Sequence, residues 1–154
     1  MSIDKGAETI VEDSLRYQLE TALEAAGWTD PEKWVIIGYV EPESSPPVVA
    51  VKYNREIART YEMGNKRPQM VYFVDRDIRG STSEESAALK DTVIQSVHPL
   101  RIIDFNTAMP EDDDFDAEDQ TLAWGDVTIK SATVVSEFDN TRRVLLTVVP
   151  KKPI

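Results

Sequence analysis

The sequence contains no cysteine and only one histidine, and both shortages limit the chemistry that the chain can perform. Without cysteine there is no disulfide framework, no thiolate metal site and no cysteine nucleophile, which fits a reducing compartment. The single histidine, His98, directly precedes Pro99, and no Gly-x-Ser-x-Gly motif supplies a nucleophile for it. We therefore expect His98 to assist the carbonyl groups at a helix end and not to act in a catalytic triad.

Long apolar runs are also missing. No stretch approaches the roughly 18 apolar residues that a membrane-spanning helix needs. Residues 1–6 do not place a basic segment before an apolar one, so no secretory signal is expected. We expect a single domain over residues 1–154, with a flexible segment at 1–8, that acts where it is made.

Basic residues are outnumbered, because 17 Lys and Arg stand against 28 Asp and Glu, for a net charge of −11. Without seven acids in one short segment the net charge would be −4, an ordinary balance. Clustered Lys and Arg bind phosphates, so the chain is not expected to hold nucleic acid, and repelling or imitating DNA is easier for it. The seven acids are Glu111, Asp112, Asp113, Asp114, Asp116, Glu118 and Asp119.

Hydrophobic periodicity predicts two helices and several strands. One amphipathic helix is expected over 11–26, closed by a left-handed cap at Gly27. A second is expected over 83–97, where Ser81 and Glu84 have capping-box spacing. Strands are expected at 34–40, 48–53, 70–78, 100–105 and in a hairpin over 125–149 that turns near Asp139-Asn140.

The order of these elements predicts an α+β fold with a mainly antiparallel β-sheet, two α-helices on one side and a C-terminal β-hairpin. The first two strands are separated only by the proline-rich segment 41–47, which favours an antiparallel pair. Residues 54–67 have no clear period and could form an irregular strand or a long excursion. In the strand at 70–78, Met70, Tyr72, Val74 and Ile78 share one face. A sheet covered on one side leaves its other face or its edges open to a partner.

The long acidic loop expected at 106–123 is the obvious candidate for a metal site. The sixth position of a calcium loop is Ala117 instead of glycine, and the twelfth is Ala123 instead of a bidentate Glu. We therefore expect a solvated or partner-facing loop, with no bound metal and no cofactor. The first three ligand positions of that loop are matched by Asp112, Asp114 and Asp116.

Paired carboxylates could also arise at strand ends, where Asp75, Asp77 and Asp104 are expected. The same residues serve as turn formers, and no glycine-rich phosphate loop accompanies them. The sequence contains no complete catalytic set, so the chain is expected not to be an enzyme.

Several short motifs follow one another along the chain. Together with the N-terminal amphipathic helix and the two-strand excursion, they resemble tailed-bacteriophage neck proteins, in particular those of the tail terminator (tail completion) type, over about residues 11–150. The motifs are Tyr61-Glu-Met-Gly64, the strand Val71-Tyr-Phe-Val-Asp75, the helix at 83–97, Ile103-Asp-Phe-Asn106 and Trp124-Gly-Asp-Val127.

This resemblance implies a non-enzymatic virion protein, a ring subunit and commonly a hexamer, that caps the tail tube and joins it to the head connector. Its partners would be other copies of itself, the tail tube protein and the connector proteins, in the host cytoplasm during assembly and in the tail or neck afterwards. Genomic DNA would pass through the ring without specific binding, and no membrane would be involved.

Within such a ring, the acids at 111–119, or Asp75 and Asp77, are candidates to face the lumen or a neighbouring ring, since negative walls deny phosphates a docking site. Two other functions stay open. One is a small acidic DNA-mimic inhibitor, and the other is a metal-dependent enzyme that uses the acidic loop. A phage-derived injection apparatus is compatible with the same ring role.

Overall fold

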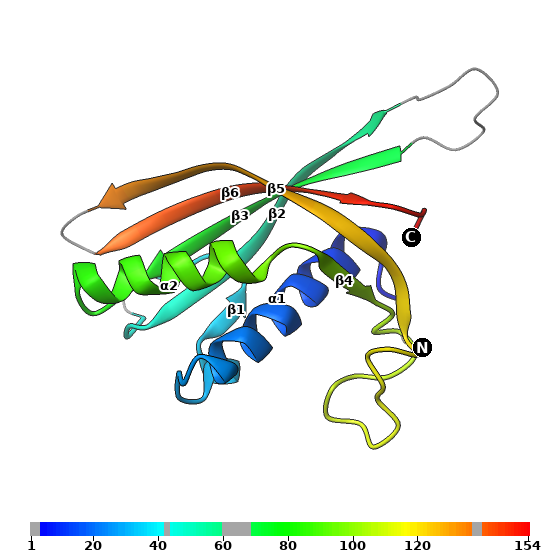
Figure 1. The fold of residues 1–154 in the computed structure, drawn as a ribbon, viewed down its shortest axis with the longest axis horizontal. Helices are drawn as coiled ribbons and strands as arrows, with labels where there is room; N and C mark the ends of the chain where they lie inside the picture. The colour runs from blue at the N-terminus through cyan, green and yellow to red at the C-terminus, as the bar shows by residue number, and fades with distance from the viewer. Residues whose placement is uncertain (1–3, 42–43, 60–68, 137–139) are drawn as a thin grey trace.

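The computed structural model describes residues 4–41, 44–59, 69–136 and 140–154 (Figure 1). The motif at 61–64, most of the predicted excursion at 54–67 and Asp139 of the predicted turn lie outside these ranges. The described elements are α1 (Ala7–Ala25), the 3-10 helix η1 (Pro31–Lys33), β1 (Val35–Ile37), β2 (Val48–Arg59), β3 (Gln69–Arg79), α2 (Ser83–Ser96), β4 (Leu100–Ile103), β5 (Thr121–Ser136) and β6 (Thr141–Pro150).

The six strands form one sheet in the order β1-β2-β3-β6-β5-β4. Every neighbouring pair is antiparallel except β1 with β2, and β5 and β6 form the expected C-terminal hairpin. Both helices lie against the same side of the sheet (Figure 1). The fold is therefore α+β as predicted, and we call the opposite side of the sheet the bare face. No helix in the described ranges has the length and apolar character needed to cross a membrane.

The predicted antiparallel pairing of the first two strands is wrong, because β1 runs parallel to β2. After β1 the chain turns at Gly38, whose φ of 114° lies in the region that glycine adopts without steric cost. The Gly38 N–H donates to the Val51 carbonyl at 2.9 Å, which ends the ladder at that point. Strand β2 then runs in the same direction as β1.

Helix α1 begins at Ala7, four residues before its predicted start, and it buries one stripe against the sheet. Its end agrees with the prediction, since Gly27 has a φ of 94°. The Trp28 N–H donates to the Leu23 carbonyl at 3.0 Å, which satisfies a carbonyl that the helix end would leave unpaired. The buried stripe consists of Ile10, Val11, Ser14, Leu15, Leu19 and Leu23.

The capping box of α2 lies one residue later than the sequence spacing predicted. The Thr82 hydroxyl accepts the Glu85 N–H at 3.1 Å, and the Glu85 carboxylate accepts the Ser81 N–H at 2.9 Å. Gly80 lies just before this cap and passes close to the first turn of the helix, since a Cβ there would lie 2.5 Å from the Ser86 nitrogen. Only glycine fits at this position without a shift of the backbone.

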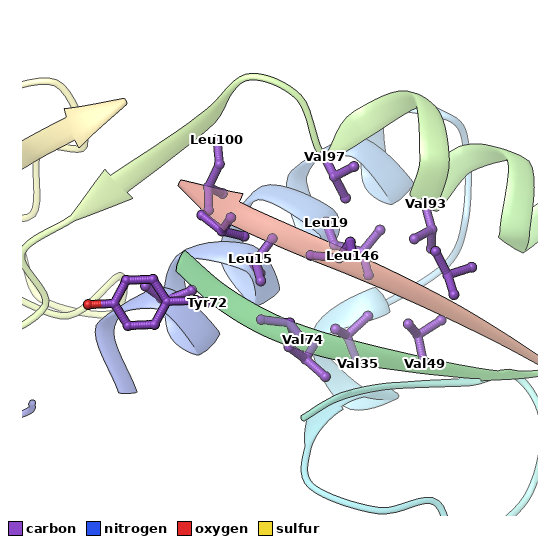
Figure 2. Close-up of a cluster of buried hydrophobic side chains, with 14 of the residues drawn as sticks. Leu15, Leu19, Val35, Val49, Tyr72, Val74, Val93, Val97, Leu100 and Leu146 are labelled. Atoms are coloured by element: carbon purple, nitrogen blue, oxygen red, sulfur yellow. The ribbon is translucent and has the colours of Figure 1, made fainter. Parts of the chain in front are cut away.

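The core fills the space between the two helices and the sheet (Figure 2). The predicted alternation in β3 is confirmed for Tyr72, Val74 and Ile78, which are buried on the covered face. Each fully buried aliphatic side chain contributes about 1.5–3 kcal/mol to folding. The core therefore holds α1, α2 and the central strands together as one unit.

Candidate functional site

The acidic loop, residues 104–120 between β4 and β5, is held against α1 by three aromatic rings. The rings of Phe105 and Phe115 stack with centroids 6.1 Å apart and an interplanar angle of 6°. Tyr17 of α1 meets both rings edge-on, at 6.2 Å from Phe105 and 5.4 Å from Phe115. Such pairs contribute about 0.5–1.5 kcal/mol each beyond their burial, so the loop has a defined seat on the helix.

Gln120 ties the two ends of the acidic loop together. Its buried side-chain amide donates to the carbonyls of Asp104 at 2.9 Å and Ala108 at 3.0 Å. Its side-chain oxygen accepts the Asp116 N–H at 3.1 Å. The loop therefore has the compact form of an Ω-loop, with close ends and packing by its own side chains.

Some of the loop acids accept hydrogen bonds from the backbone of the loop itself. The Asp112 carboxylate accepts the Met109 N–H at 2.8 Å, and the Asp116 carboxylate accepts the Glu118 N–H at 3.0 Å. Asp104 caps a turn in the same way, through the Asn106 N–H. Two of the three acids of the calcium-loop pattern are thus turned onto the backbone of the loop. No group of three or more His, Asp and Glu residues in the described ranges is arranged to hold a metal ion.

The other loop acids are exposed, and their carboxylates accept no hydrogen bond from any residue that the structure describes. They project from a backbone whose position is fixed by the aromatic rings and by Gln120. The loop therefore presents a group of uncompensated negative charges at a defined place. These acids, which we call the five outward acids, are Glu111, Asp113, Asp114, Glu118 and Asp119.

Beside the aromatic contact with Tyr17, a groove of about 460 Å³ lies between α1 and the first part of the loop. Along its helix side, the guanidinium of Arg16 lies 3.0 Å from the Glu20 carboxylate. Burial raises the pKa of the Glu20 carboxyl, and Arg16 opposes this rise. The groove has an apolar floor and a mainly acidic rim, so its rim favours contact with positively charged groups. Its lining residues are Asp13, Arg16, Tyr17, Glu20, Glu32, Phe105, Met109, Pro110 and Glu111.

The other predicted site residues, Asp75 and Asp77, lie on the bare face of β3, away from the acidic loop on the helix side. Asp77 binds Arg143 of β6 through both carboxylate oxygens, at 2.8 and 3.4 Å. This partner raises the pKa of Arg143. Asp75 lies opposite Lys52 of β2 and Leu145 of β6. The structure thus divides the predicted candidates into two separate groups.

His98 does not serve helix carbonyls as predicted. Its Nδ1 accepts the backbone N–H of Val127 in β5 at 3.0 Å. Helix α2 has already ended at Ser96, and the chain there turns into β4 next to β5, which brings the ring beside the strand. The histidine therefore closes the sheet edge at the point where β4 begins.

The structure also reveals a residue that the sequence reading missed. Arg76 of β3 is fully buried on the covered face, where its Nη2 donates to the Leu15 carbonyl at 3.3 Å. Its Nε and Nη1 have no partner among the described residues, and burial lowers the pKa of Arg76 to about 9. The signal was present in the sequence, because position 76 falls in the same alternation as Val74 and Ile78.

No protein-family model matches the chain. No curated protein matches it either. Among solved structures, it is similar to a chain from a structure described as "Virion of native gene transfer agent (GTA) particle". The TM-score is 0.49 and the identity is 11%, over 91% of this chain and 92% of that chain. A similarity with so low an identity and TM-score does not indicate a shared function.

Proposed function

We propose that the chain is a structural virion protein of a tailed phage, a tail terminator or neck ring subunit. It caps the tail tube and joins it to the head connector, and it breaks no bond of any substrate. Its proposed partners are other copies of itself, the tail tube protein and the connector proteins. The sequence resemblance given above supports this role, together with the geometry of the acidic loop.

The observation that carries the proposal is the fixed placement of the five outward acids. A flexible acidic tail would spread its charge through solvent, whereas this loop is seated on α1 by Tyr17, Phe105 and Phe115. A ring of such loops would form a negative wall of constant shape. Because like charges repel, phosphates passing such a wall gain no docking site, and DNA moves through without being held.

The shape of the sheet is also suited to a subunit that contacts several neighbours. The β2–β3 hairpin and the β5–β6 hairpin point toward opposite ends of the sheet (Figure 1). The bare face lies between them, with the charged pair of Asp77 and Arg143 on the two central strands, near the β5–β6 turn. A closed ring needs two different surfaces on each subunit, and a sheet with two unlike ends provides them.

A charge-neutral variant of the loop tests the role of the wall. Glu111→Gln, Asp113→Asn, Asp114→Asn, Glu118→Gln and Asp119→Asn together remove the charge of the five outward acids. Asp112 and Asp116 are kept, because their carboxylates accept backbone N–H groups. In a phage lacking the wild-type gene, this variant should still assemble particles but should lower DNA delivery, measured as infectious units per DNA-filled particle.

The matched control neutralises five exposed acids outside the loop. It carries Glu24→Gln, Asp30→Asn, Glu41→Gln, Glu84→Gln and Asp91→Asn, and it should retain full infectivity. Equal infectivity of the loop variant and wild type would contradict the proposal that the five outward acids form a negative wall for DNA passage.

Electron microscopy of particles made without this chain tests the broader role, since tails should then lack a normal end or fail to join heads. Complete, joined tails would overturn it. A monomer that blocks a DNA-binding enzyme would instead support the DNA-mimic alternative, and tight stoichiometric cation binding in calorimetry would support the metal enzyme.

A further inference from the structure

Strand β5 has a long outer edge beside which no described strand lies. Its neighbour β4 pairs with it only as far as Gly125. Beyond that point His98 accepts the Val127 N–H, and the edge then continues past the end of the neighbouring strand. We call residues 128–135 the β5 edge. Most of its side chains are exposed, so neither helix covers it.

Strand β2 has a corresponding edge at the other end of the sheet. Its neighbour β1 pairs only with residues 49–51. The Glu12 carboxylate of α1 then accepts the Tyr53 N–H at 2.9 Å, as His98 does on β5. We call residues 54–59 the β2 edge, and within the described ranges no strand lies beside it.

The far part of β2 and β3 is a ribbon of two strands only. Strand β6 pairs with β3 no further than Tyr72, whereas β2 and β3 remain paired out to Arg59 and Gln69. A two-stranded ribbon is marginally stable by itself, and a third strand stabilises it. The β2 edge is the longer of the two sides of this ribbon on which a strand could be added.

The β5 edge lacks much of the protection that sheet edges normally carry. The β5 edge contains no proline and one charged residue, Lys130, and its Val134 and Val135 side chains are each 50% exposed. The β2 edge is more polar, since it carries Arg55, Glu56 and Arg59 beside Ile57, which is 39% exposed. Between two register irregularities, the ladder of β5 with β6 is regular over residues 131–134, which gives an incoming strand an even stretch to pair with.

We propose that the β2 edge of one copy pairs with the β5 edge of the next copy, extending the sheet from subunit to subunit. Strand direction favours this partner, because β2 and β5 are antiparallel within one chain. A second copy placed in the same orientation therefore continues the antiparallel alternation across the contact. The contact is heterologous, as a ring requires, so this inference rests on the proposed function and names the surface that builds the ring.

The size of the contact predicts when it forms. Four to six paired residues span about 13–20 Å at roughly 3.3 Å per residue. With a strand layer about 10 Å thick, such a contact buries on the order of 300–400 Å² in total, below the roughly 1,000 Å² of a stable interface. Single pairs of copies are therefore weak, and the ring persists only when each copy makes two such contacts or is seated on a tube end.

Cysteine cross-linking tests the pairing directly, since the natural chain has no cysteine. The full chain carrying Ala58→Cys on the β2 edge and Thr133→Cys on the β5 edge is treated with a flexible bis-maleimide. The protein is used at about 1 mM, where a contact with a millimolar dissociation constant is substantially populated. The expected product is a ladder of dimers, trimers and higher species, because each copy offers one thiol at each contact.

The control variant, Ala58→Cys with Glu84→Cys, has the same number of thiols but places the second on the exposed surface of α2. It should give no ladder. Thr133→Cys alone should stay monomeric, and efficient dimers from it would instead indicate a two-fold pairing of β5 with β5. Adding Val134→Lys and Val135→Lys to the double-cysteine variant should abolish the ladder without lowering the unfolding temperature, because both positions are exposed.

A double-cysteine ladder no stronger than the control at this concentration overturns the proposal. The same samples are imaged on isolated tail tubes, which separates the two conclusions. Rings on tube ends without a ladder would overturn the edge pairing alone. A ladder from protein that never joins tube ends would support the pairing and overturn the tail role.

Discussion

The covered and bare faces of the sheet place similar residues in very different surroundings. On β3, Arg76 points under the helices and is fully buried with two unpartnered nitrogens. Its neighbour Asp77 points to the bare face and holds Arg143 through two contacts. The packing of the covered face therefore determines whether the chain folds. On the bare face and at the open edges, another molecule can bind without disturbing that packing.

The largest difference between the two faces is expected at adjacent positions of β6. Leu146 is buried under the helices, and Leu145 lies on the bare face. Leu146→Ala should lower the free energy of unfolding by about 2–5 kcal/mol, because it removes buried methyl groups and leaves a cavity. Leu145→Ala should cost about 1 kcal/mol or less. Urea unfolding of both variants measures this, and equal losses would show that the bare face is covered in the monomer.

Arg76 allows a test in the opposite direction. Arg76→Met should raise the free energy of unfolding by about 1–4 kcal/mol, because an apolar side chain of similar length replaces a buried charge without a carboxylate partner. Arg76→Ala should destabilise, since it leaves a cavity. A loss of stability in Arg76→Met would show that the contact with the Leu15 carbonyl outweighs the cost of burying the charge.

The advantage of Arg76→Met should also depend on pH. Burial lowers the pKa of Arg76 from 12.5 to about 9 in the folded state. Above that pH the folded chain releases the proton while the unfolded chain keeps it, so the stability of wild type rises with pH. The difference between the two proteins should therefore be smaller at about pH 10 than at about pH 7. An unchanged difference would place the folded pKa of Arg76 above this range.

The ion pair on the bare face should contribute much less than the core. Arg143 and Asp77 are both partly exposed, and pairs of this kind contribute about 0.2–1 kcal/mol. A double-mutant cycle with Asp77→Asn and Arg143→Gln measures the coupling directly. A coupling of more than about 2 kcal/mol would mean that the bare face is less accessible to water than its exposure indicates.

The smallest effect is expected next to the β2 edge, where the Glu12 carboxylate accepts the Tyr53 N–H. Burial raises the pKa of the Glu12 carboxyl above 4.5, and the bond from the Tyr53 N–H opposes this rise. Between the unfolded and folded pKa values the folded chain holds more protons, so wild type loses stability as the pH rises through this interval. Glu12→Gln keeps an acceptor for Tyr53 and removes the titration.

Relative to wild type, the Glu12→Gln variant should therefore become more stable between about pH 4 and about pH 7 in urea unfolding. A constant difference between the two proteins across this range would contradict the raised pKa.

Most of the architecture could be predicted from local patterns. The stripe of α1, the alternation of β3 and the cap at Gly27 each depend on residues within one turn or one strand of each other. The direction of β1 against β2 could not be predicted this way, because a short spacing fits a hairpin as well as a parallel return. That choice was made by the turn at Gly38 and by packing against α1.

The candidate site was also predicted only in part. The acidic segment was visible in the sequence as charge, but its seat was not, because Tyr17 is 88 positions before Phe105 in the chain. His98 and Glu12 could not be recognised as caps of sheet edges, since the strands that they cap are distant in sequence.

The sequence by itself determined the order of the helices and strands, the side of β3 that faces the core, and the place where negative charge is concentrated, because all three follow from residue order at short range. The tertiary structure alone decided that β1 runs parallel to β2, that Arg76 is buried without a carboxylate, and that two strand edges are left open at opposite ends of the sheet. These features arise from contacts between distant segments, and their free energies depend on burial and geometry that residue order does not specify.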